Sequence, residues 1–166
     1  MSPDRIMVLH GPGKAGLYRH PGSIPGQGVE KLYIFLFLLK KMKNFFSTNI
    51  RKEAIKNNFF RKVLATKSNA QVVVMSLNPG EDIGMEVHKK YDQILVNVSG
   101  KGVYIVNGKK GKFEKDSLVY VPKGTRHNFI NIGKTRLKLF TIYSPPNHPP
   151  GTVHKTKKEA ERAEKD

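Results

Sequence analysis

The feature that most constrains the fold is a series of short apolar runs between residues 71 and 143, each ended by turn-forming residues. Runs of roughly four to eight residues that are rich in β-branched and aromatic side chains predict β-strands. We expect strands at residues 71–77, 93–98, 102–106, 118–121, 128–132 and 137–143. Short strands at this spacing, with turns between them, indicate an all-β sandwich or barrel.

The turn at Asn107-Gly108 gives the clearest local prediction. Both central residues of a type I′ turn need positive φ, and the pair Asn-Gly meets that requirement well. We therefore expect a β-hairpin whose first strand covers residues 102–106.

Two polar motifs lie among the predicted strands. The first consists of Gly80, Glu86, His88, Gln93 and Gly100. The second consists of Asp116, Pro122, Gly124, His127 and Asn131. Alternate residues of a strand point to the same face, so Glu86 and His88 should converge, with His127 coming from a neighbouring strand.

Four residues of these motifs have side chains suited to a transition-metal site, namely Glu86, His88, Gln93 and His127. One carboxylate and two imidazoles suit Fe(II), and Mn, Ni or Zn can bind the same ligands. The neutral amide of Gln93 is a weaker donor, so it either binds the metal or supports a ligand from behind. The alternative is a structural role for each histidine, a solvent-facing Glu86 and a site that binds no metal.

The spacing of both motifs resembles that of the cupin superfamily. The first cupin motif reads Gly, five residues, His-x-His, three or four residues, Glu, six residues and Gly. This chain keeps that spacing, with Glu86 in place of the first His and Gln93 in place of the Glu. The second reads Gly, five residues, Pro-x-Gly, two residues, His, three residues and Asn, and only Asp116 departs from it. The resemblance covers roughly residues 45–166 and extends to small bacterial cupins labelled mannose-6-phosphate isomerase-like.

The resemblance implies a double-stranded β-helix, or jelly-roll barrel, over residues 42–144 with a short C-terminal helix. It also implies a divalent metal at the four residues named above, a small-molecule ligand and a homodimer. Apolar residues between 45 and 64, such as Phe59, Phe60, Val63 and Leu64, belong either to a dimer contact or to the core of the monomer.

Three functions fit such a site. In the first, the metal is a Lewis acid acting on a small polar molecule, for example a sugar or sugar phosphate in an isomerase, and an acid or base moves the proton. The second is an Fe(II)-dependent dioxygenase, and the third is a non-catalytic module that binds a sugar or another small ligand. Candidates for proton transfer are Glu86, Lys90, Tyr104 and Tyr120. Residues that either attract a phosphate or form a solvated surface are Lys89, Lys90 and Lys123.

The amino-acid composition excludes further kinds of chemistry and of binding partner. The 166-residue chain has a formal net charge of +17 and no cysteine, which excludes disulfides, thiolate nucleophiles and iron–sulfur clusters. Lysine outnumbers arginine and asparagine is frequent, whereas base-reading surfaces rely on arginine. We attribute the charge to codon bias and expect no specific nucleic-acid partner. The lack of cysteine is compatible with a reducing cytosol, and we expect a cytoplasmic protein without a membrane span.

The two ends of the chain differ from the predicted barrel. Residues 1–41 are rich in turn formers, and we expect a flexible extension. Either its apolar run packs against another surface, or the extension is not part of the natural protein, which is the hypothesis that we favour. Its apolar run at 32–39 spans about 12 Å as a helix, which is too short for a bilayer core of roughly 30 Å. Residues 145–166 form a Pro-rich tail, where we expect His148 and His154 at the surface. A capping box at Thr156 and Glu159 predicts one helix from Lys157 to about Glu164.

Overall fold

The computed structural model describes residues 27–42 and 45–164 of the chain, which divides into two units at residues 1–45 and 46–166. In the first unit, α1 (Gln27–Met42) includes the apolar run that we noted, and its side chains from Leu32 to Leu36 are exposed. We expected residues 1–41 to be flexible, so this helix was not predicted, and residues 1–26 lie outside the described part. No described helix combines the length and the apolar character that crossing a membrane requires.

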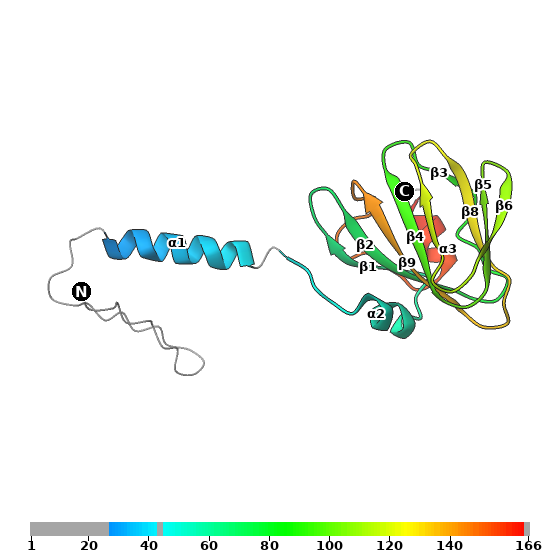
Figure 1. Cartoon of the computed structure of the whole chain (residues 1–166), viewed down its shortest axis with the longest axis horizontal. Helices are drawn as coiled ribbons and strands as arrows, with labels where there is room; N and C mark the ends of the chain where they lie inside the picture. Colours follow the sequence, from blue (N-terminus) through cyan, green and yellow to red (C-terminus); the bar gives the residue numbers. More distant parts are fainter. Residues whose placement is uncertain (1–26, 43–44, 165–166) are drawn as a thin grey trace. The chain divides into compact units, whose positions relative to one another are not determined.

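The second unit consists of two antiparallel sheets (Figure 1). One sheet has the order β10-β1-β2-β9-β4-β7 and the other has the order β3-β8-β5-β6. Their strands are β1 (Arg61–Thr66), β2 (Gln71–Leu77), β3 (Glu86–Val87), β4 (Asp92–Ser99), β5 (Gly102–Val106), β6 (Lys109–Phe113), β7 (Leu118–Val121), β8 (Arg126–Asn131), β9 (Leu137–Ser144) and β10 (Val153–His154). The predicted all-β jelly roll is confirmed.

All six predicted strands are present, within two residues at each end. The predicted hairpin joins β5 to β6, and its turn residues Asn107 and Gly108 have φ values of 48° and 78°. Sequence analysis missed β6 itself, because Lys-Lys-Gly-Lys-Phe has little apolar character and forms a strand through pairing with β5. It also missed β1, which begins with two basic residues.

The main core lies between the two sheets and contains large apolar side chains from both, among them Met75, Leu95, Phe113, Phe129 and Leu139. A smaller cluster lies beneath α2 (Ile50–Lys56), where Ala54 packs with Val74 and Val98. The helix α2 begins at Asn49, whose side-chain oxygen accepts a hydrogen bond from the amide of Lys52. Both apolar layers therefore fix the large sheet from its two faces.

The apolar residues between 59 and 64 were predicted to belong either to a dimer contact or to the core of the monomer, and the structure answers this in part. Phe60 and Val63 are buried in the main core of the monomer, and Leu64 packs against the cluster under α2. Phe59 is 37% exposed. The core of the monomer thus accounts for three of these four residues, and the homodimer remains a prediction.

The tail that follows β9 is packed against the barrel. The strand β10 pairs with β1, and α3 (Lys157–Ala163) buries Ala160 in the main core. The predicted capping box forms in part: Thr156 accepts from the amide of Glu159, whose carboxylate accepts from the amide of Lys155 and not from that of Thr156. Two ion pairs, Arg61 with Glu164 and Lys157 with Asp82, tie α3 to both sheets. This packing brings the tail next to the polar motifs.

Candidate metal centre

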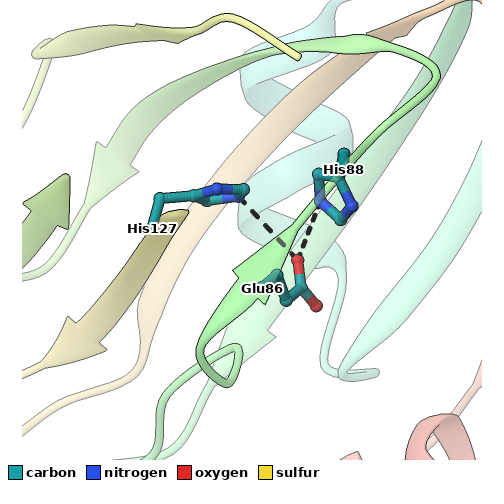
Figure 2. A group of neighbouring side chains, drawn as sticks. All are labelled: Glu86, His88 and His127. Atoms are coloured by element: carbon teal, nitrogen blue, oxygen red, sulfur yellow. Dashed lines mark ion pairs between the residues drawn. The ribbon is translucent and has the colours of Figure 1, made fainter. Parts of the chain in front are cut away.

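Three of the four predicted ligands meet at the edge of the smaller sheet. Glu86 opens β3, His88 follows that strand directly, and His127 lies on β8 opposite Glu86 in the pairing register. One ligand atom from each of Glu86, His88 and His127 lies within 4.8 Å of the others, and Figure 2 shows the carboxylate between the two rings. The geometry therefore agrees with the period-two argument made from the sequence.

One carboxylate oxygen is the centre of this group. Glu86 Oε2 lies 3.0 Å from Nε2 of His88 and 3.9 Å from Nε2 of His127. The His127 side chain is fully buried, whereas Glu86 and His88 are 19% and 12% exposed. A site with these burials is closed on the barrel side and reachable from the side of Glu86 and His88.

The hydrogen bonds of His127 determine which of its nitrogens is free to bind a metal. Its Nδ1 lies 2.9 Å from the carbonyl oxygen of Thr125, which can only accept, so Nδ1 carries the proton. Burial lowers the pKa of His127 by more than the Thr125 carbonyl and Glu86 raise it, so the ring is neutral near pH 7. The lone pair of Nε2 is then directed toward the site.

Gln93 lies beside this nitrogen and is also buried. Its Oε1 is 3.0 Å from Nε2 of His127, and its amide nitrogen donates to the hydroxyl of Tyr143 at 3.1 Å. In this arrangement an oxygen lone pair faces a nitrogen lone pair, which a cation between them would stabilise. Gln93 is thus placed either to bind the metal or to support His127, and the two roles stay open.

His88 supplies the test of whether a metal fits. Its Nε2 is buried and has no hydrogen-bond partner among the described residues, although Glu86 Oε2 is close. Its Nδ1 lies 2.8 Å from the hydroxyl of Tyr91. A buried nitrogen without a hydrogen bond, next to a carboxylate and a second imidazole, fits the donor set of a divalent transition metal.

The second motif also holds the first in place. Gly124 has a φ of 79°, a conformation that glycine adopts without strain, and its amide donates to the carbonyl of His88 at 2.7 Å. Asn131 is fully buried and donates to the carbonyls of Leu77 and Thr135. The carbonyl of Asn131 also accepts from the amide of Gly80 at 3.0 Å, so Gly124 and Asn131 each connect the second motif to the first.

A cleft of about 380 Å³ opens next to the metal centre. Its walls are Glu86, Val87, His88, Tyr91, Asn147, His148, Pro149, Ala163 and Glu164. Burial, followed by the charge of Glu86, raises the pKa of Tyr91, so its hydroxyl stays protonated at any physiological pH. Beside the candidate metal ligands, the cleft thus offers the uncharged hydroxyl group of Tyr91 as a hydrogen-bonding group.

Several residues that we considered for proton transfer or phosphate attraction lie elsewhere. Tyr104 and Tyr120 line a separate groove between the edge strands β6 and β7. Residues that are exposed and do not line the cleft are Lys89, Lys90 and Lys123. Of the two tail histidines expected at the surface, His148 lines the cleft, and both are only partly exposed.

Sequence reasoning missed the residues that complete the walls of the cleft. Tyr91 follows His88 by three residues, a spacing that carries no signal in a loop. Asn147 and His148 come from the Pro-rich tail, whose packing depends on long-range contacts with β2. The polar pair Asn147-His148 within a run of prolines was the only local sign.

Comparisons with known proteins place the chain among its relatives. The family described as "Cupin domain" matches residues 73–143. The uncharacterized protein YrkC of Bacillus subtilis is 47% identical over 125 residues, which are 72% of this chain and 67% of the relative. The uncharacterized protein L612 of Acanthamoeba polyphaga mimivirus is 37% identical over 70% of this chain and 75% of its own. The crystal structure of BH2720 from Bacillus halodurans has a TM-score of 0.70 and 40% identity, and covers 70% and 93% of the two chains.

Proposed function

This chain belongs to the cupin superfamily, and from that premise we propose that it binds a divalent transition metal and uses it to act on a small polar molecule. Glu86, His88 and His127 would hold the metal. Gln93 is proposed as a fourth ligand or as the support of His127. The observation that carries the proposal is that one ligand atom from each of Glu86, His88 and His127 lies within 4.8 Å of the others.

The bound metal would supply Lewis-acid polarisation of a carbonyl or hydroxyl group. The protein's own residues supply the rest. The buried His127 closes the inner side of the site, and the cleft beside Glu86 and His88 leaves the outer side open to a ligand. Tyr91 fixes the His88 ring and keeps its proton, so it is available as a hydrogen-bond donor.

The walls of the cleft favour an uncharged ligand. They contain no lysine or arginine among the described residues, and the Glu164 carboxylate is already paired with Arg61 at 2.8 Å. A phosphate would find no free cation there apart from the metal. We therefore favour a sugar or a related hydroxy-carbonyl compound over a sugar phosphate, and an isomerase-type reaction as the first candidate.

A second candidate is an Fe(II)-dependent dioxygenase. The observation that favours it is the composition of the triad, since two histidines and one carboxylate form the ligand set of non-haem Fe(II) oxygenases. A non-catalytic module that binds a sugar in the cleft is the alternative if no metal is taken up.

Elemental analysis of the purified protein tests the proposal, alongside Glu86→Ala, His127→Ala and a His154→Ala control. We expect about one equivalent of Fe, Mn, Ni or Zn in the parent and in the control, and little in the two site variants. His154 is a suitable control because it is a partly exposed histidine that does not line the cleft. Absence of metal in the parent after reconstitution would rule the proposal out.

The element and the reaction products then separate the two enzyme classes. Fe(II)-dependent oxygen consumption would favour the dioxygenase. Interconversion of an aldose and a ketose, followed by NMR without oxygen uptake, would favour the isomerase.

A further inference from the structure

The Pro-rich tail places one histidine in the wall of the cleft next to the candidate metal centre. His148 lines the same cleft as Glu86 and His88, although it lies sixty residues beyond His88 in the chain. None of the family's motif positions includes it. Its contacts determine how the side chain is held and which ring nitrogen can bind a ligand in the cleft.

A fully buried side chain fixes the backbone of His148. The Gln71 amide nitrogen donates to the carbonyl of His148 at 2.7 Å, and the amide of His148 donates to Gln71 Oε1 at 3.0 Å. Gln71 itself is 0% exposed and begins β2. The imidazole also packs edge-on against the ring of Tyr143, with centroids 5.2 Å apart. Because both backbone and ring are constrained, the side chain keeps one position without a ligand.

A single hydrogen bond identifies which nitrogen of His148 is protonated. The Asn147 amide nitrogen lies 3.2 Å from Nε2 of His148, and an amide nitrogen can only donate. Nε2 therefore accepts, and in the neutral ring Nδ1 carries the proton. This Nδ1 has no partner among the described residues. Burial, with further contributions from Arg61, His154 and His88, lowers the pKa of His148 to about 3, so the ring is neutral at pH 7.

We propose that His148 orients the ligand by donating a hydrogen bond from Nδ1 to an oxygen atom of a small uncharged molecule bound at the metal centre. This inference rests on the proposed function, because it needs a ligand held at Glu86, His88 and His127. A neutral donor selects an oxygen acceptor without requiring a negative charge on the ligand. Gln71 is then a positioning residue that acts through His148.

Binding of a simple probe to the metal-loaded protein tests the role. The Co(II)-loaded protein is titrated with hydroxyacetone, a small uncharged molecule with a hydroxyl group next to a carbonyl group, and the visible spectrum reports binding. The variants are His148→Phe, which keeps the ring packing, and His148→Asn, which keeps a donor near Nδ1. The control is His154→Phe, a histidine of the same tail that does not line the cleft.

We expect the dissociation constant of the probe to rise about tenfold in His148→Phe, the loss of one hydrogen bond to a ligand. His148→Asn should stay within about threefold of the parent, and His154→Phe should not differ. Metal content and thermal unfolding are measured on every variant. A merely structural role would not produce rescue by asparagine at unchanged metal content.

The outcomes separate this inference from the proposed function. If the parent binds metal and probe, and His148→Phe binds the probe equally well, the inference is overturned and the proposed function stands. If the parent takes up no metal, the inference about His148 and the proposed function are both overturned. A second measurement needs no ligand: long-range ¹H–¹⁵N NMR of the metal-free protein at pH 7 should show His148 neutral with the proton on Nδ1. A proton on Nε2, or a charged ring, overturns the inference directly.

Discussion

Replacing Glu86 by glutamine should stabilise the metal-free protein while abolishing its response to metal. In the parent, Nε2 of His88 is buried without a hydrogen bond. It is an acceptor in the tautomer in which Nδ1 carries the proton and donates to the Tyr91 hydroxyl, which is the tautomer that metal binding through Nε2 requires. The amide of Glu86→Gln introduces N–H donors at a position 3.0 Å from His88 and 3.9 Å from His127. One unsatisfied buried nitrogen then gains a donor.

The size of the effect follows from the burial of the group. An unsatisfied buried acceptor costs about 1–3 kcal/mol, and the partial exposure of both side chains, 12% for His88 and 19% for Glu86, places this case near the lower limit. A gain of about 1 kcal/mol raises the Tm of a domain of this size by about 3–6 °C. In the parent, metal at 100 times its Kd adds about 2.7 kcal/mol, which corresponds to a rise of roughly 10 °C.

Differential scanning calorimetry with and without metal measures both effects, and Glu114→Gln is the matched control. Glu114 is exposed, and its side chain has no hydrogen bond or ion pair to the described residues, so the control repeats the charge change away from the site. We expect the metal-free Tm to rise only in Glu86→Gln, and the metal-induced rise to fall below about 2 °C if affinity drops about 100-fold. A lower metal-free Tm in Glu86→Gln, or an undiminished response to metal, would refute the reasoning.

Two further predictions concern other parts of the barrel. Because the pKa of His148 is lowered to about 3 by burial, the unfolded state binds more protons between about pH 3 and pH 6.5, so the parent should lose stability as pH falls through that window. Urea unfolding of His148→Asn should show a shallower loss, and an identical slope would contradict the burial of a neutral ring. Gly111→Ala should cost about 1–3 kcal/mol, because the new Cβ would lie 2.2 Å from atoms of the Tyr104 ring. Urea unfolding of the double variant with Tyr104→Leu should recover part of that loss, and equal costs in both backgrounds would contradict the steric explanation.

A strand could be predicted from the sequence where its own residues have a high strand propensity. The runs at 71–77 and 137–143 consist mostly of apolar or β-branched residues and lie in the middle of the large sheet. The strand β6 is different, since its three lysines carry no strand signal and its pairing with β5 follows from the Asn107-Gly108 turn. The helix α1 was missed because the glycine- and proline-rich sequence before it suggested a flexible segment throughout.

In the candidate site, too, some residues could be predicted from local sequence and others depend on long-range contacts. Glu86 and His88 lie two residues apart, so local strand geometry brings them together, and the motif spacing supplies His127. The other wall of the cleft could not be predicted, because His148 is positioned by a buried glutamine seventy-seven residues earlier in the chain. The side-chain amide of Gln71 reads from the sequence as an ordinary polar position at the start of a strand.

The candidate metal centre lies where the sheet itself provides the least support. The strand β3 has two residues and is at the edge of its sheet, so ladder hydrogen bonds alone would leave Glu86 and His88 free to move. Their precision has to come from individual contacts across the site: the Gly124 amide on His88, the Tyr91 hydroxyl on its ring, and the Thr125 carbonyl on His127. Such contacts contribute little to the core, which lies between the sheets. Substitutions at these supports should therefore weaken metal binding before they weaken the fold, whereas substitutions in the main core should do the reverse.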